Sequence, residues 1–196
     1  MLLRKLCVIC GSAGAAVCPT CAGGFVAPDV VTLPAGLDAL TSVLRFDGTG
    51  RDLILALKYR NRRDGVALLA SAMAATVDPC TIDAVTWAPT SPARRRQRGY
   101  DQAQLLAVAV ARRLGRPCPR LLRRLPSAPQ TGLDATHRRI GPSFRATSGA
   151  RGRVLLVDDV GTTGATLAAG ADALRRAGAA GVSGVTAAVT PLKVTF

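Results

Sequence analysis

The sequence predicts an α/β protein, in which helices cover both faces of a parallel sheet and a small cysteine-bearing element precedes it. From Thr41 onward, apolar segments of strand length alternate with segments of helical periodicity, which favours a parallel sheet. Arg151 to Asp158 passes from basic residues into a continuous aliphatic run, as in a central strand buried on both faces. The 196 residues suffice for one full domain with a small appendage.

The individual elements follow from periodicity and from residues that end helices. Leu53, Ile54 and Leu57 fall on one face of the first helix, and Gly115 and Gly178 stand just past two later ones. We expect strands over Thr41 to Phe46, Ile82 to Trp87, Arg151 to Asp158 and Val182 to Val189, and helices over Arg51 to Tyr59, Val66 to Val77, Gln102 to Leu114 and Thr163 to Ala177.

Composition divides the chain into three parts: a cysteine-bearing element over residues 1–26, a proline-punctuated linker over 27–40, and the α/β domain over 41–196. No apolar run approaches the roughly 20 residues of a transmembrane helix, so we expect no transmembrane segment. The N-terminus lacks the apolar core of a signal peptide. We therefore expect a cytoplasmic protein.

The chain is strongly basic, with 26 lysines and arginines against 12 acidic residues and a formal net charge of +14. Such a charge favours polyanionic partners, either nucleic acid or phosphorylated metabolites, although it also simply keeps a protein soluble. The densest region is Arg94 to Arg124, in which Asp101 is the only acid.

This basic region is a candidate surface for single-stranded DNA. The chain is only 4% aromatic, so we expect contact with the DNA backbone and a steep salt dependence rather than base stacking. The alternative is a solvated, arginine-rich helix face. The candidate nucleic-acid-binding residues are Arg94, Arg95, Arg96, Arg112 and Arg113.

Four cysteines in the first 26 residues have the spacing of a structural zinc site. Cys7, Cys10, Cys18 and Cys21 form two CxxC pairs separated by seven residues, and each pair can turn two sulfurs toward one tetrahedral ion. A disulfide is disfavoured in a reducing compartment, and a redox CxxC normally stands alone. With no open coordination position, a zinc ion here would fold a segment too short for its own core.

The segment VLLVDDVGTTGATL places two adjacent carboxylates, Asp158 and Asp159, at the end of a predicted strand. Open α/β sheets bind ligands at this edge. A helix cap requires one side-chain oxygen, which accounts for one aspartate but not for two. Paired carboxylates can accept hydrogen bonds from the vicinal hydroxyls of a sugar.

The residues that follow are suited to a phosphate. Gly161 and Gly164 lead the chain into a predicted helix. The N–H groups at the start of this helix favour an anion, and the hydroxyls of Thr162, Thr163 and Thr166 can donate to the same anion. A Walker A loop would require a lysine where Ala165 stands. Carboxylates that can bind hydroxyl groups, followed by a loop that can bind a phosphate, together indicate a phosphorylated sugar as the ligand.

These residues closely resemble the phosphoribosyl pyrophosphate (PRPP) motif of type I phosphoribosyltransferases. The chain as a whole resembles the ComF family, in which such a domain follows a four-cysteine zinc element. LALKYR (Leu55 to Arg60), ARRRQRGYDQAQLLA (Ala93 to Ala107) and QTGLDATHRR (Gln130 to Arg139) occur in the order found in that family. The resemblance implies a type I phosphoribosyltransferase-like sheet.

It also implies residue roles. Asp158 and Asp159 would hold the ribose hydroxyls, and the 5′-phosphate would lie on the loop formed by Gly161, Thr162, Thr163, Gly164, Ala165 and Thr166. Lys58 and Tyr59 match the pyrophosphate-binding position, and Arg98, Gly99 and Tyr100 match a mobile segment that covers the site. Magnesium would accompany PRPP by bridging its diphosphate oxygens.

Two functions follow from the resemblance. The first is a PRPP-binding protein of the ComF type that acts with DNA-processing proteins in the uptake or processing of single-stranded DNA during natural transformation. The alternative is an active phosphoribosyltransferase that transfers ribose 5-phosphate to an unidentified acceptor, with Asp158 or Asp159 as the catalytic carboxylate that steadies positive charge at the anomeric carbon. Fold alone does not decide between them, and the oligomeric state stays open.

Overall fold

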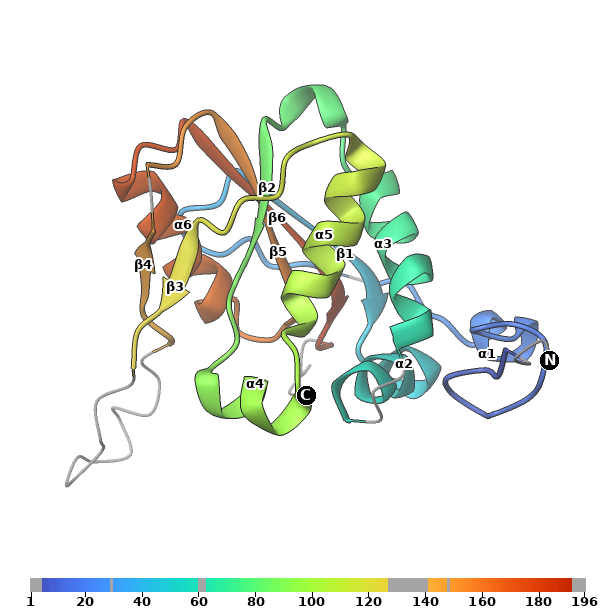
Figure 1. Cartoon of the computed structure of the whole chain (residues 1–196). Coiled ribbons are helices and arrows are strands. Elements are labelled where there is room, and N and C mark those ends of the chain that lie inside the picture. Colours follow the sequence, from blue (N-terminus) through green and yellow to red (C-terminus); the bar gives the residue numbers. More distant parts are fainter. Residues whose placement is uncertain (1–4, 29, 60–62, 127–140, 148, 192–196) are drawn as a thin grey trace, which may run out of the picture.

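The computed structural model describes residues 5–28, 30–59, 63–126, 141–147 and 149–191. Its centre is a four-stranded, fully parallel sheet in the order β1-β6-β5-β2. The strands are β1 (Ala39–Arg45), β2 (Ala84–Trp87), β5 (Arg153–Gly161) and β6 (Gly181–Val189). The long strands β5 and β6 lie at the centre (Figure 1).

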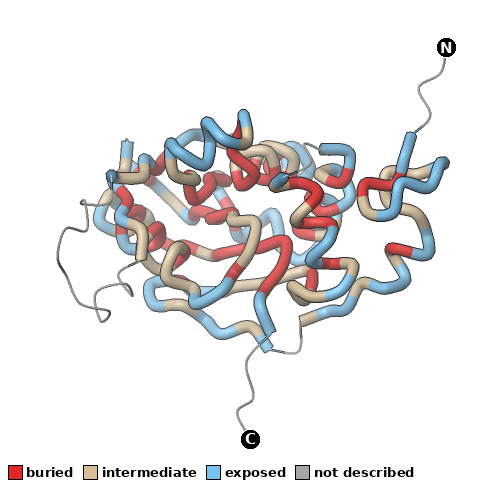
Figure 2. The backbone as a smooth tube through the Cα atoms, turned by 90° about the horizontal axis from the view of Figure 1, so that it is seen from below, coloured by how far each residue is buried: buried red, intermediate tan, exposed pale blue. Residues whose placement is uncertain are grey.

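Helices cover both faces of the sheet, which confirms the predicted fold class. On one face lie α2 (Gly48–Tyr59), α3 (Val66–Ala75) and α5 (Gln102–Leu114), packed on Leu155 and Val157 of β5. On the other face lie α6 (Ala165–Arg176) and a hairpin of β3 (Leu122–Arg124) and β4 (Phe144–Ala146), packed on Val154 and Leu156. Figure 2 shows the resulting band of buried backbone between exposed outer surfaces.

The predicted elements exist, and the bounds of α5 agree with the prediction. The predicted end of β5 at Asp158 is wrong, because pairing with β6 continues through Asp158 opposite Thr186 to Gly161 opposite Val189. Helix α6 accordingly begins at Ala165 rather than at Thr163. The acid pair therefore lies inside strand β5, which continues two residues past Asp159.

Several short elements were not predicted: α1 (Pro19–Gly23), α4 (Pro92–Arg98), the hairpin, and the 3-10 turns η1 (Arg63–Gly65) and η2 (Pro79–Thr81). Helix α4 has regular ends. The Ser91 hydroxyl accepts a hydrogen bond from the Arg94 N–H at 3.3 Å, and Gly99 ends the helix with a φ of +79°. The basic segment before α5 is thus helical.

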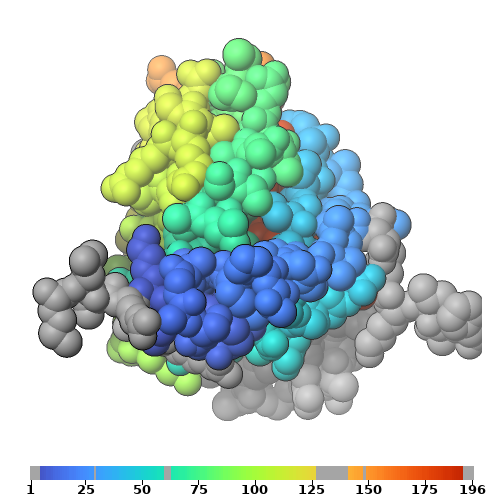
Figure 3. All heavy atoms as spheres, turned by 90° about the vertical axis from the view of Figure 1, so that its right-hand side faces the viewer, coloured from blue at the N-terminus to red at the C-terminus, as the bar shows by residue number. Residues whose placement is uncertain are grey.

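The N-terminal element and the segment after it are packed on the domain. Val8 is buried in the core shared with α2 and α3, and Figure 3 shows the N-terminal segment in blue against this region. Leu37 is buried, and the Asp38 carboxylate accepts a hydrogen bond from the Val182 N–H at 2.8 Å. None of the helices described in these ranges has the length and hydropathy needed to cross a membrane.

Candidate functional site

A pocket of about 340 Å³ opens at the carboxyl edge of the sheet, where β2, β5 and the start of α5 converge. The predicted acid pair and part of the predicted phosphate loop line it. Its lining consists of Phe46, Lys58, Ala88, Pro89, Thr90, Arg94, Arg98, Asp101, Gln102, Ala103, Arg124, Asp158, Asp159, Val160, Thr162 and Thr166. The topology thus brings α2, α4 and β5 to one site.

Lys58 and the acid pair form the polar centre of this pocket. Lys58 Nζ lies 3.1 Å from Asp159 Oδ2, and both side chains are largely buried, with 16% and 15% of their surface exposed. The Asp159 N–H donates to Asp158 Oδ1 at 2.8 Å. Lys58, which was predicted as a site residue and lies about a hundred residues before the acid pair in the sequence, therefore neutralises one of the two carboxylates.

Two carboxyl groups of the pocket hold protons more tightly than usual. Burial, and then the negative charge of Asp159, raise the pKa of Asp158 well above its ordinary value. Burial also raises the pKa of Asp101, whose carboxylate accepts hydrogen bonds from the N–H groups of Thr90 and Gln104. Pairs of carboxyl groups with displaced pKa values are common at ligand sites.

Arg98 connects two walls of the pocket. Its Nη1 donates to Gln102 Oε1 at 2.8 Å, and its Nη2 donates to the Tyr59 hydroxyl at 3.1 Å. The guanidinium also lies over the Tyr59 ring, 4.9 Å from its centre. Among the residues that the structure describes, Arg98 Nε and Gln102 Nε2 are buried donors that have no acceptor. Tyr59 is exposed and reaches the pocket only through Arg98.

The segment predicted to cover the site lies at the end of helix α4. Arg98 ends helix α4 and Gly99 caps it, while Tyr100 is buried and its hydroxyl donates to the Leu57 carbonyl. The segment is therefore a capped helix fixed to α2 by a buried tyrosine. The sequence of α4 gives no helical periodicity, because four of its seven residues are arginines and it has no apolar face.

The predicted phosphate loop is only partly directed into the pocket. Thr162 and Thr166 line it, whereas Gly161 is buried in the sheet and Thr163 lies outside the lining. Gly164 stands at the N-cap of α6 with a φ of +76°, and no side chain caps this helix end. The Ala165 N–H donates to Thr163 Oγ1 at 3.4 Å, so the N–H groups that follow it in the first turn of α6 are the ones available to an anion at the pocket's edge.

The predicted nucleic-acid residues lie on two helices, with Arg94, Arg95 and Arg96 on α4 and Arg112 and Arg113 on α5. Arg94 lines the pocket and Arg96 is exposed on α4. Arg112 and Arg113 lie in the last turn of α5, at the opposite end of a 13-residue helix that is about 20 Å long (Figure 1). The Arg113 guanidinium donates to the Ala67 carbonyl, so it belongs to the α3–α5 contact.

Thr90, Asp101, Gln102 and Arg124 line the pocket but were not predicted as site residues. Thr90 could have been found, because β2 ends at Trp87 and the next residues share an edge of the sheet with the acid pair. Arg124 lies on the hairpin, which no sequence pattern indicated. The segment Gln130 to Arg139, including His137, lies outside the described residues.

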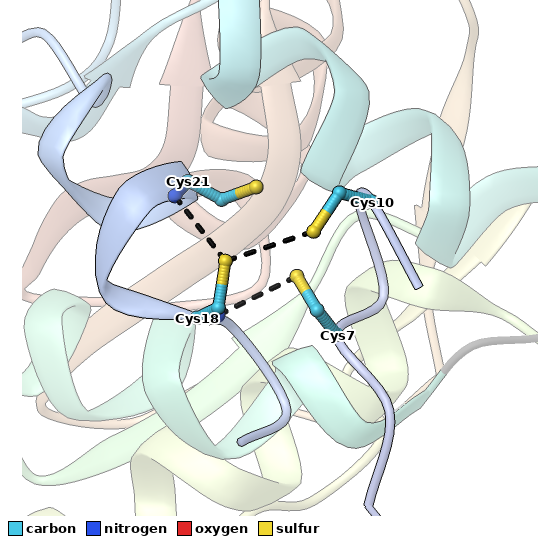
Figure 4. A group of neighbouring side chains, drawn as sticks. All are labelled: Cys7, Cys10, Cys18 and Cys21. Carbon is cyan, nitrogen blue, oxygen red and sulfur yellow. Dashed lines mark hydrogen bonds between the residues drawn. The ribbon is translucent and has the colours of Figure 1, made fainter. Parts of the chain in front are cut away.

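A second site is the predicted cysteine cluster (Figure 4). The sulfurs of Cys7, Cys10, Cys18 and Cys21 all lie within 4.8 Å of one another, and those of Cys10 and Cys18 are 3.6 Å apart. Zinc–sulfur bonds of about 2.3 Å in a tetrahedron place sulfurs about 3.8 Å apart, so the cluster could hold a metal ion. Burial raises the pKa of Cys21 to about 12.

Comparison with known proteins gives the following. No protein-family model matches the chain, and no curated protein matches it. Twelve chains of solved structures are similar. One is the glutamine PRPP amidotransferase from B. subtilis complexed with ADP and GMP, with 23% identity over 64% of this chain and 26% of that chain, and a TM-score of 0.45.

Another is described as the allosteric regulatory enzyme of purine biosynthesis, with 22% identity over 64% of this chain and 26% of that chain, and a TM-score of 0.44. The present chain thus spans about a quarter of the length of these two proteins. Likeness of this degree assigns no activity to the chain.

Proposed function

We propose that the pocket at the carboxyl edge of the sheet binds PRPP, as the ComF-like motifs imply. The observation that carries the proposal is the combination of paired carboxylates, a buried lysine and an uncapped helix N-terminus around one cavity. Asp158 and Asp159 accept hydrogen bonds from the ribose hydroxyls. Thr162, Thr166 and the N–H groups at the start of α6 bind the 5′-phosphate.

The cations of the pocket would bind the diphosphate. Lys58, Arg94 and Arg98 line the cavity, and Arg98 is held by Gln102 and Tyr59. The unpartnered donors Arg98 Nε and Gln102 Nε2 suit a ligand rich in acceptor oxygens. Magnesium, when bound with PRPP, would neutralise charge on the diphosphate oxygens.

The proposal extends to the metal and to the biological role. A structural zinc ion fits the four thiolates, because nitrogen and oxygen ligands are absent from the cluster. The exposed arginines of α4 support contact with a polyanion such as single-stranded DNA. The role in DNA uptake or processing, in the cytoplasm and with DNA-processing proteins, follows from the ComF resemblance.

Calorimetric titration with magnesium and PRPP tests the core of the proposal. Asp159→Asn replaces a carboxylate acceptor for a ribose hydroxyl by a weaker amide acceptor, so PRPP binding should weaken about tenfold to hundredfold. Asp172→Asn is a matched control, since Asp172 is an exposed residue of α6 outside the pocket. Equal heats for the wild type and Asp159→Asn, or no heat from the wild type, would contradict PRPP binding.

The transferase alternative is separated from simple binding by the fate of the diphosphate. Release of pyrophosphate from PRPP in the presence of one of a panel of nucleobases would identify an enzyme. Binding without pyrophosphate release would identify a PRPP-binding protein. Titration with single-stranded DNA pentamers tests the other partner, and we expect affinity to fall steeply as salt rises.

A further inference from the structure

A second pocket of about 300 Å³ adjoins the first on the other side of the segment between β2 and α4. The two share Pro89, Thr90, Asp101 and Arg124 as a common wall. The remaining residues of the second pocket are Trp87, Pro92, Arg95, Gln104, Arg120 and Arg123. None of the residues assigned to PRPP lines it, so a ligand bound there would be held by a different set of side chains.

The second pocket carries uncompensated positive charge. Arg95, Arg120 and Arg123 are exposed, and within the described part of the chain none of their guanidinium groups has a carboxylate or carbonyl partner. The one acid of the wall, Asp101, directs its oxygens to the N–H groups of Thr90 and Gln104. The arginines are therefore free to bind an anion.

Arg124 adds to this charge from the common wall. Burial, and then the positive charge of Arg94, lower the pKa of Arg124. An anion bound beside it would oppose both effects, because it supplies the counter-charge that the site lacks. Phosphate suits such a group of arginines, because each guanidinium can donate two hydrogen bonds to two phosphate oxygens.

The inner part of the pocket has apolar residues in its lining. Trp87 is only 5% exposed and contributes to the lining together with Pro89 and Pro92. Trp87 belongs to the core beneath the pocket, so a small part of its indole together with the two proline rings offers apolar contact to a ring. The pocket therefore combines an apolar surface for a ring with arginines for an anion at its rim.

We propose that this second pocket binds a nucleotide unit, with its base against Trp87 and the two prolines and its phosphate on Arg95, Arg120 and Arg123. The proposal does not depend on PRPP in the first pocket. A free mononucleotide and the end of a nucleic-acid strand present the same chemistry, and the experiment separates them.

Trp87 provides a local readout, because it is the only tryptophan of the chain and lines the second pocket but not the first. Titration with adenosine 5′-monophosphate should change its fluorescence in a saturable way. Adenosine and inorganic phosphate should each bind at least about tenfold more weakly, because each lacks one half of the ligand. A fluorescence that adenosine 5′-monophosphate leaves unchanged would overturn the proposal, as would equal affinity for adenosine or for inorganic phosphate.

Arginine variants test the anion contacts. Arg95→Gln/Arg123→Gln should weaken nucleotide binding about tenfold to hundredfold. Arg51→Gln/Arg151→Gln removes the same charge from exposed residues outside both pockets and should bind like the wild type. Equal weakening of the two double variants would show a general charge effect and overturn the site. Asp159→Asn should leave nucleotide binding unchanged while weakening PRPP, which separates the two proposals.

A 5′-phosphorylated DNA pentamer identifies the source of the nucleotide. Tighter binding of the pentamer than of adenosine 5′-monophosphate, with the same loss in Arg95→Gln/Arg123→Gln, would support a strand end as the ligand. Equal affinity would support a free nucleotide. Absence of binding by both would overturn the proposal.

Discussion

Replacement of Lys58 by methionine should destabilise the protein through the acid pair. Lys58 Nζ and Asp159 Oδ2 are 3.1 Å apart, which corresponds to a Coulomb attraction of about 5 kcal/mol at an effective dielectric constant of 20. The desolvation of both groups offsets most of this attraction in the wild type. In Lys58→Met, Asp159 keeps its desolvation penalty and loses its partner, so the free energy of unfolding should fall by about 3 kcal/mol.

The loss should depend on pH in a defined direction. Burial and the charge of Asp159 already raise the pKa of Asp158 above its value in the unfolded chain, near 4, and removal of Lys58 removes a charge that lowers it. The folded state then binds more protons than the unfolded state, so stability decreases as pH rises through this range. The difference between Lys58→Met and the wild type should therefore be large near about pH 7 and small near about pH 4.

Urea unfolding followed by circular dichroism measures this difference at both pH values. Arg176→Met is the control, because it removes a cation from an ion pair with Asp172 whose side chains are 68% and 55% exposed. Its effect should stay within about 1 kcal/mol. Adding Asp159→Asn to Lys58→Met should restore most of the stability. A loss no larger than that of Arg176→Met, or a loss independent of pH, would refute the reasoning.

Three further outcomes can be checked. Asp158→Asn should raise the free energy of unfolding by about 1 kcal/mol near neutral pH, because the raised pKa of Asp158 means that its ionisation destabilises the fold as pH increases. The same variant should weaken PRPP binding. Unfolding at two pH values measures the stability, and a variant less stable than the wild type at neutral pH would contradict the prediction. Gly164→Ala should destabilise by at least about 1 kcal/mol, because its φ is +76° and a Cβ would stand 2.6 Å from Pro34 Cγ; thermal unfolding tests it, and an unchanged melting temperature would argue against it. Thiol titration of the metal-loaded protein should label Cys80, which is exposed, and leave Cys118 unlabelled, because burial raises the pKa of Cys118 to about 11. A chelator should then make the four clustered thiols reactive. Equal labelling with and without chelator would exclude a bound metal.

The elements that sequence reasoning found are those whose pattern reflects burial. The run Val154 to Val157 is aliphatic because both faces of β5 are covered, and α5 has one apolar face that ends at Gly115. The ends of elements near charges were less predictable. Strand β5 continues past Asp158, since its hydrogen bonds to β6 do not depend on which side chains it carries.

Helix α4 could have been predicted from its ends. Ser91 and Pro92 give an N-cap followed by proline at the first helical position, and Gly99 gives the left-handed end. The three-residue strands of the hairpin gave no comparable signal, because LRR and FRA are too short to show a period. The contribution of Arg124 to the pocket was therefore invisible in the sequence.

The acid pair explains what the first pocket can select. Lys58, Arg94, Arg98 and Arg124 line it against Asp101, Asp158 and Asp159, so its positive charge is largely balanced. A bare polyanion gains little there, since the carboxylates repel it, whereas a ligand with both phosphates and hydroxyls can satisfy every group. The second pocket has the opposite balance, with arginines and one carboxyl group that is already engaged by backbone N–H groups. Because the two pockets share Arg124 but differ in this balance, we expect them to select different phosphorylated ligands.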